Sequence, residues 1–205
     1  MYDKGYYFQS LIEEIGTNKK YLKGKILNAG AGTVRKLDGL LNGNIINQDF
    51  MDLEGIDLVC ALDKMPVHNS YFDSIICNAV LEHVPEPIPA IKELYRVLRK
   101  GGYLYLCIPF MQPEHLNPGD YQRYTKDGII KLVQDAGFRV VKCEGIASVY
   151  QTIGWVITEW LESEPRLLYK ILKSIAYPIL RNRCKYSKTY VNNIATAYRV
   201  IAQKI

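Results

Sequence analysis

The chain has 205 residues, of which 48% are hydrophobic and 23% charged, values typical of one globular domain with a single core, here residues 1–205. Seven Lys and Arg residues lie within 165–190, where no acidic residue occurs, so the net charge of +5 becomes −2 without this segment. A charge confined to one segment argues against a broad nucleic-acid-binding face, and no run reaches the ~18 apolar residues of a transmembrane helix.

The cysteines and histidines show no pattern of a disulfide framework or a metal site. The five cysteines are odd in number, and no Cys or His falls at metal-ligand spacing along the chain. We therefore predict reduced thiols and no metal ligands. The first residues show no signal-peptide hydrophobic segment, which leads us to expect a cytoplasmic protein.

The order of apolar runs predicts an α/β fold. Residues 1–23 indicate a short aromatic-rich helical segment that ends at Gly16. The early apolar runs that follow are continuous rather than alternating, as expected for strands buried on both faces. We predict strands at 25–29, 44–47, 58–61, 72–78, 103–108, 138–143 and 194–202.

Two segments between the strands have helical spacing. One has apolar residues at 91, 94, 95 and 98, with prolines near its start and Arg99-Lys100-Gly101-Gly102 at its end. The other repeats the spacing at 129, 132, 133 and 136, with Thr125 as N-cap and Gly137 as its stop. Alternating strands and helices predict a doubly wound, mostly parallel seven-stranded sheet. The connection 48–57 is too short for a full crossover helix, so we predict a turn there.

A glycine turn follows the first predicted strand, in Lys25-Ile-Leu-Asn-Ala-Gly-Ala-Gly-Thr33. Gly30 and Gly32 let the backbone approach a ligand closely, and Asp49, at the end of the next strand, suits a ribose diol. Taken alone, the two glycines are equally compatible with an ordinary turn. Arg35 stands where a dinucleotide fingerprint has its third glycine, and no Gly-Lys-Ser/Thr follows, which disfavours a nicotinamide oxidoreductase and a P-loop.

Three stretches together resemble the class I S-adenosylmethionine-dependent methyltransferases of type 11. They are the glycine turn at 26–33, Phe72-Asp-Ser-Ile-Ile-Cys-Asn-Ala-Val-Leu-Glu-His-Val-Pro-Glu-Pro87, and Val97-Leu-Arg-Lys-Gly-Gly-Tyr-Leu-Tyr-Leu-Cys-Ile-Pro109. The resemblance covers roughly residues 20–145 and returns at the last strand. It implies the seven-stranded methyltransferase fold, with S-adenosylmethionine as cofactor.

The resemblance also implies where the cofactor binds. Asp49 would hold the ribose, the segment 61–66 would flank the adenine, and backbone near residues 28–30 would meet the amino-acid tail. The cofactor residues that we expect are Asn28, Ala29, Gly30, Gly32, Asp49, Phe50, Leu62, Asp63, Asn78 and Ala79. The chain departs from the family pattern at Asn28 and Ala61, where Asp is usual, and at Val34, where Gly is usual.

A loop after the fifth strand predicts the acceptor site. Residues 109–125 are rich in Pro and Gly, and in an open α/β sheet such a loop lies beyond the strand ends where ligands bind. The substrate candidates are His115, Asp120, Tyr121, Arg123 and Tyr124. The alternative is a solvated loop in which Asp120 pairs locally with Arg123 and Thr125 only caps a helix.

Methyl transfer needs an in-line nucleophile and exclusion of water, and a hydroxyl acceptor also needs a base. His115 and His83 are the candidates for that base, although His83 could instead orient backbone. His68 lies in a turn, and we expect it to be exposed.

Residues 146–190 form a predicted helical insertion before the last strand, with apolar side chains on one face and Arg166, Lys170 and Lys173 on the other. It could cover the domain, contact an anionic membrane surface through residues 165–188, or form a homodimer; Trp155 and Trp160 suit any of these or a lid. We expect methyl transfer to oxygen or nitrogen of a small-molecule or glycan-type acceptor, and no nucleic-acid partner. The alternative is a catalytically silent protein that binds a nucleoside or a partner.

Overall fold

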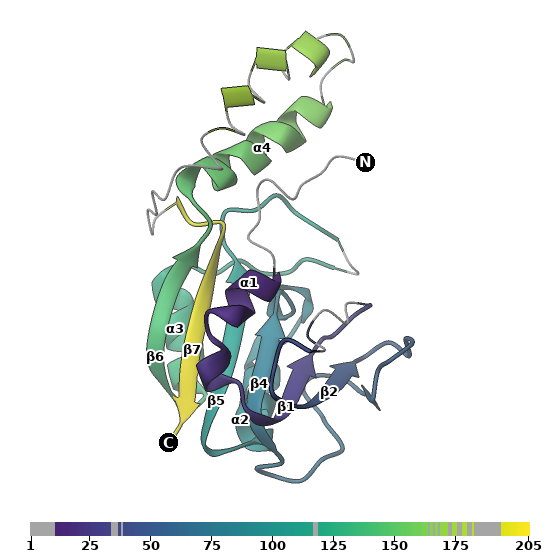
Figure 1. Cartoon of the computed structure of the whole chain (residues 1–205), viewed down its shortest axis with the longest axis vertical. Coiled ribbons are helices and arrows are strands. Elements are labelled where there is room, and N and C mark those ends of the chain that lie inside the picture. Colours follow the sequence, from purple (N-terminus) through teal and green to yellow (C-terminus); the bar gives the residue numbers. More distant parts are fainter. Residues whose placement is uncertain are drawn as a thin grey trace.

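The computed structural model describes residues 11–33, 37, 39–116, 119–163 and 194–205, together with residues 165, 167, 169–171, 174–175, 178–179 and 182. Among these residues seven strands form one sheet in the order β3-β2-β1-β4-β5-β7-β6 (Figure 1). The strands are β1 (Gly24–Ala29), β2 (Gly43–Asp49), β3 (Leu58–Val59), β4 (Phe72–Asn78), β5 (Leu98–Pro109), β6 (Phe138–Ile146) and β7 (Ala197–Lys204). β7 runs antiparallel to its neighbours β5 and β6, whereas the pairs on the other side are parallel. The predicted mostly parallel, doubly wound sheet is confirmed.

Helices flank the sheet on both faces. They are α1 (Leu11–Gly16), α2 (Pro87–Val97), α3 (Lys126–Asp135) and α4 (Val149–Ser163), with two short 3-10 helices, η2 (Lys19–Tyr21) and η3 (Leu81–His83). Side chains of α2 and α3 pack on one face, and Ile15 of α1 packs on the other. This arrangement explains the continuous apolar runs, because successive residues of a strand point to opposite faces and both faces are covered.

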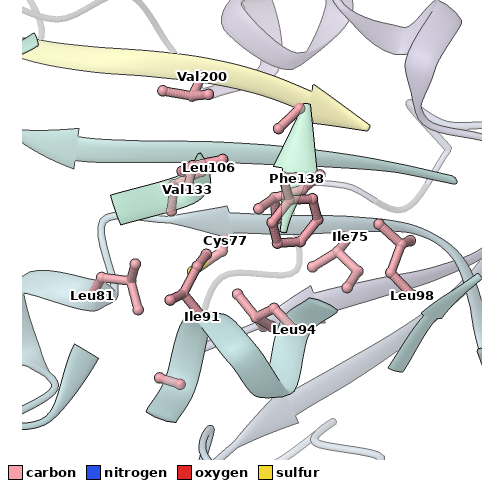
Figure 2. Close-up of a cluster of buried hydrophobic side chains, with 14 of the residues drawn as sticks. Ile75, Cys77, Leu81, Ile91, Leu94, Leu98, Leu106, Val133, Phe138 and Val200 are labelled. Carbon is pink, nitrogen blue, oxygen red and sulfur yellow. The ribbon is translucent and has the colours of Figure 1, made fainter. Parts of the chain in front are cut away.

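The core between α2 and the sheet shows this alternation directly. Ile91 and Leu94 of α2 face Ile75 and Cys77 of β4 in Figure 2. Ile76, which lies between them in the strand, belongs to the cluster on the opposite face. A one-residue slip of β4 would exchange the two sets, so burial on both faces specifies the register.

Apart from the start of β5, the strand boundaries lie within three residues of the predicted ones: β3 ends at Val59 instead of residue 61, and β7 spans 197–204 instead of 194–202. β4 has the predicted bounds, and Thr125 Oγ1 accepts a hydrogen bond from the Gly128 N–H at the start of α3, as an N-cap does. The connection between β2 and β3 contains no helix, as predicted. β5 differs: α2 ends at Val97 and the strand already begins at Leu98, ahead of the glycine pair. Leu98 pairs with Phe72 of β4, so sheet pairing rather than a glycine stop ends the helix.

The carboxyl ends of β1, β2, β4 and β5 meet at one edge of the sheet, and α4 projects beyond this edge (Figure 1). The loop that follows β5 starts there as well. In the described part of the chain, no helix has the length and apolar character needed to cross a membrane. The edge formed by these strand ends is where the predicted site residues lie.

Candidate functional site

The turn after β1 is shaped by two glycines in the left-handed region. Gly30 has a φ of 63° and Gly32 a φ of 56°. A Cβ on Gly30 would lie 2.5 Å from Cγ2 of Val80, whereas a Cβ on Gly32 would meet nothing within 4 Å. Gly30 is therefore required by packing against the segment after β4, and Gly32 borders open space. Val34 and Arg35 lie outside the described residues.

Asp49 is almost fully buried at the end of β2, and it holds this turn. Its Oδ2 accepts the Gly32 N–H at 2.8 Å, and its Oδ1 accepts the Met51 N–H at 3.0 Å. Each oxygen keeps a lone pair that can accept from a hydroxyl group. The backbone N–H groups of Gly32 and Met51 therefore fix the orientation of the carboxylate that we predicted to bind a ribose.

Gln48 is a site residue that the sequence reading missed. Its Oε1 accepts the Gly30 N–H at 3.1 Å, and its Nε2 donates to the Cys60 carbonyl at 2.6 Å. One buried side chain therefore joins the glycine turn to the end of β3. A long polar side chain directly before the acid, at the end of a predicted strand, was the signal that could have revealed it.

The two asparagines of the predicted cofactor site have different surroundings. Asn28 is buried, and its Nδ2 donates to Oδ1 of Asn47 on β2 at 2.9 Å. Oδ1 of Asn78, at the end of β4, is buried and has no hydrogen-bond partner among the described residues. A buried acceptor of this kind is suited to a donor supplied by a ligand. Ala79, which follows, is exposed and adopts a left-handed φ of 53°.

The other predicted cofactor residues lie beside β2 and β3. Ala29 is buried in β1, Phe50 is largely exposed directly after Asp49, Leu62 is buried, and Asp63 is exposed. No described contact joins Asp63 to the glycine turn.

The segment 61–67 is tied to α2. The Arg96 guanidinium donates to the carbonyls of Met65 and Val67 at 3.1 and 2.9 Å, and Glu93 accepts the Met65 N–H at 2.7 Å. Bidentate pairing with Arg96 lowers the pKa of Glu93. The predicted adenine-flanking segment is therefore braced by a helix rather than left as a free loop.

A second cluster lies just after β4, where His83 and His115 meet although 32 positions separate them in the sequence. Their rings stand edge to face with centroids 5.1 Å apart. Both Nε2 atoms face Oε1 of Glu82, at 3.8 Å for His83 and 3.7 Å for His115. Glu82 is fully buried, and neither carboxylate oxygen has a hydrogen-bond partner among the described residues.

The loop after β5 closes around this cluster. The His83 ring Nδ1 contacts the Gly119 carbonyl, and the Tyr121 N–H donates to the Glu82 carbonyl at 2.7 Å. The His115 N–H donates to Oδ2 of Asp120 at 2.9 Å. These backbone contacts place two distant chain segments against each other at the sheet edge.

Asp120 and Arg123 form a bidentate ion pair, which matches the local pairing considered for this loop. The Arg123 guanidinium lowers the pKa of Asp120 to about 2. Glu82 raises the pKa of His115, and the Pro113 carbonyl and Asp120 act in the same direction against the effect of burial. Arg123 therefore serves first to orient Asp120, and Asp120 to orient His115.

The two tyrosines of the loop differ. Tyr121 is exposed, whereas the Tyr124 hydroxyl donates to Oε1 of Gln122 at 2.6 Å. Gln122 in turn donates to the Val84 carbonyl at 2.6 Å. Tyr121 is therefore the tyrosine free to meet a ligand, and Tyr124 braces the loop.

Glu82 was the larger omission of the sequence reading. Its neighbour His83 was singled out, but a Glu beside a predicted turn is ordinarily an exposed residue. Only the fold shows that it is buried. His68 is exposed, as predicted.

The insertion is described in part. α4 lies between β6 and β7 in the chain, with Trp155 buried and Trp160 exposed. Of the basic residues predicted to share one face, Arg166 and Lys173 lie outside the described residues. The predicted basic helix is therefore described only at isolated positions.

Comparison with known proteins identifies the central part of the chain. The family profile described as "Methyltransferase domain" matches residues 27–106. The chain is 32% identical over 106 residues to the tRNA U34 carboxymethyltransferase of Campylobacter hominis, covering 49% of this chain and 36% of that protein. It spans little more than a third of the length of the first such relatives.

Two further proteins are similar over more of their length. An uncharacterized protein of Methanocaldococcus jannaschii is 27% identical over 161 residues, covering 69% of this chain and 78% of that one. A Thermotoga maritima structure described as a SAM-dependent methyltransferase, possible histamine N-methyltransferase, superposes with a TM-score of 0.64 and 15% identity, over 98% of this chain and 91% of that one. The latter similarity concerns the fold.

Proposed function

We propose that this chain is a class I S-adenosylmethionine-dependent methyltransferase, as the methyltransferase-domain match over residues 27–106 indicates, and that it transfers a methyl group to oxygen or nitrogen of a small-molecule or glycan-type acceptor. The bound cofactor supplies a methyl group on a sulfonium centre. The residues of the chain hold the cofactor, hold the acceptor and take up the proton that the acceptor loses.

The residues at the ends of β1, β2 and β4 fit this cofactor. Asp49 has lone pairs left for two hydroxyl groups, and Asn78 presents a buried acceptor without a partner among the described residues, which suits an ammonium group. Gly32 borders open space. Asn28 stands where the family usually has Asp, and its amide donates to Asn47, so we assign it to shaping the strand end rather than to a charge contact.

The acceptor lies, in this proposal, between the cofactor edge and the loop after β5. His115 is held at its outer ring nitrogen by Pro113 and Asp120, so its Nε2 is directed inward toward Glu82. A positioned imidazole can take a proton from a hydroxyl or amine as the methyl group arrives. His83 is the second candidate for this role, and exposed Tyr121 is a candidate contact for the acceptor.

The observation that carries the proposal is the buried, backbone-anchored Asp49 beside the glycine turn of a methyltransferase domain. Calorimetric titration with S-adenosylmethionine and S-adenosylhomocysteine tests it. We expect binding to one site per chain, which Asp49→Ala weakens. The absence of binding and of any thermal shift at millimolar cofactor would overturn it.

The acceptor class requires a separate experiment. The tRNA relatives match 49–65% of this chain and 36–49% of their own length, so their acceptor does not transfer to it by similarity alone. Methyl-labelled cofactor should be incubated with nucleoside-sugar and glycan fractions and with bulk tRNA. Label in the tRNA would contradict the proposed acceptor class. Cofactor binding without labelling of any fraction would favour a catalytically silent binding protein.

For the insertion, we propose contact with an anionic membrane surface. Ile153, Val156 and Trp160 of α4 are exposed and recur at near-helical spacing, and the basic residues of 165–188 follow. Vesicles with anionic headgroups should bind the protein less as salt increases. Binding that is equal for neutral and anionic vesicles would contradict the electrostatic part of this proposal, and a concentration-dependent dimer would favour the homodimer.

A further inference from the structure

The cluster after β4 contains a carboxylate for which the methyl-transfer proposal provides no partner. Glu82 is fully buried, and neither of its carboxylate oxygens has a hydrogen-bond partner among the described residues. Burial of a carboxylate is strongly unfavourable unless it is paired or coordinates a cation. The groups facing it are the Nε2 atoms of His83 and His115, at 3.8 and 3.7 Å, beyond hydrogen-bond distance.

The outer nitrogens of both rings are oriented by neighbouring groups. Nδ1 of His83 contacts the Gly119 carbonyl, and Nδ1 of His115 lies 3.4 Å from the Pro113 carbonyl and 3.6 Å from Asp120 Oδ2. At His83 the carbonyl favours hydrogen on Nδ1 and leaves the lone pair on Nε2; at His115 two acceptors favour the same tautomer against one donor, the Arg123 Nη2 at 3.5 Å. Metal-binding histidines are oriented in this way, through a carboxylate or carbonyl behind the ring.

We propose that Glu82, His83 and His115 bind a divalent transition-metal ion of the zinc type. One ligand atom from each residue lies within 4.8 Å of the other two. Ligands at about 2.1 Å from a tetrahedral zinc ion stand about 3.4 Å from one another, so each pair of ligand atoms needs to approach by at most about 1.4 Å. Two imidazoles and a carboxylate also form a known catalytic zinc set, which leaves a fourth position for water or substrate.

The local charges favour a cation. Arg123 and Asp120 neutralise each other, so the Glu82 carboxylate leaves the cluster with one negative charge when both imidazoles are neutral. Arg123 Nη2 approaches His115 Nδ1 at 3.5 Å, on the side of the ring away from Glu82. The cation position therefore lies on the Nε2 side, away from the arginine.

The role of the metal ion in methyl transfer rests on the proposed function, whereas the metal site itself does not. A bound ion would also change the role of the two histidines. A metal ion would bind the acceptor's oxygen or nitrogen at its open position and lower the pKa of that group. The histidines would then act as ligands rather than as proton acceptors. The two roles give different experimental results.

The test uses the whole chain after removal of metals with a chelator. Calorimetry with Zn²⁺ and visible absorption with Co²⁺ should show one ion per chain in a low-coordinate site. His83→Ala and His115→Ala should each weaken binding by on the order of a hundredfold or more, and Asp120→Asn by about ten- to a hundredfold. His68→Ala is the matched control, because His68 is exposed and outside the cluster.

Glu82→Gln keeps the shape of the buried side chain and should also lose the ion. A thermal melt reports whether this variant folds. If it does not fold, the two histidine variants decide the test. Binding that is absent, or unchanged in both histidine variants, overturns the metal site. Loss of turnover in His115→Ala without any bound metal makes the histidine a base and also overturns it. Cofactor titration of the same protein separates the two proposals: metal binding without cofactor binding overturns only the proposed function.

Discussion

Asp49 and Glu82 are two buried carboxylates at the same edge of the sheet, and their surroundings differ. Asp49 accepts two backbone N–H groups from the turn that it supports, whereas Glu82 has no hydrogen-bond partner among the described residues. The Asp49 carboxylate is therefore hydrogen-bonded within the fold and can accept further hydrogen bonds from a ligand on its remaining lone pairs. The Glu82 carboxylate depends on the charge of the imidazoles, or of an ion, that face it.

The largest effect is expected on the Glu82 side. His115→Ala should reduce kcat about 10²–10⁴-fold, because a positioned proton acceptor or ligand is lost. Affinity for S-adenosylmethionine should stay unchanged in calorimetry, since no described contact joins His115 to the glycine turn. His68→Ala is the control, and a His115→Ala variant with full turnover would remove the histidine from the reaction.

On the Asp49 side the effect should be on binding. Asp49→Ala should weaken the cofactor about ten- to a hundredfold, through one or two lost charge-assisted hydrogen bonds of ~1.5–3 kcal/mol. Asp52→Ala is the control, because Asp52 is an exposed carboxylate three residues after Asp49. An unchanged affinity in the Asp49 variant would reject the ribose assignment and leave the carboxylate a purely structural role.

The two glycines of the turn beside Asp49 have different surroundings: Gly30 packs against Val80, and Gly32 borders open space. Gly30→Ala should destabilise the protein by about 2–4 kcal/mol, because a left-handed Cβ and overpacking against Val80 both act there. Gly32→Ala should cost about 1–2 kcal/mol, from its positive φ alone. Chemical denaturation of both variants measures the difference in their free energies of unfolding. The double variant Gly30→Ala/Val80→Ala should recover the part of the loss that comes from overpacking against Val80. Equal losses would show that Val80 is not the constraint.

The smallest effect concerns the brace of the segment 61–67. Because the pKa of Glu93 is lowered in the folded state, its contribution to stability is present above its ordinary pKa and is lost as the pH falls through the lowered value. We expect about 0.5–1 kcal/mol at pH 7. Thermal melts of Glu93→Gln and the original chain should converge on acidification. A difference that grows toward low pH would contradict the assigned ion pair.

The fold follows closely from local patterns. Burial on both faces explains the apolar run Ile75–Cys77 within β4, Thr125 caps the start of α3, and Gly137, with its positive φ, follows the end of that helix. β5 is the exception, because pairing with Phe72 extends the strand back to Leu98, ahead of the glycine pair. Gln48 was missed for a related reason, since its role depends on contacts with two other strand ends.

The sequence alone indicated a methyltransferase domain, the order of strands and helices along the chain, and the glycine turn with its acid, because each depends on spacing between near neighbours. Only the tertiary structure decided that Glu82 is buried and that His83 and His115 both face it. Residues 32 positions apart meet when the loop after β5 folds back to the end of β4, and no local pattern encodes that distance. The local pair of Asp120 with Arg123 was one of two alternatives open from the sequence, and the path of the loop decided for it.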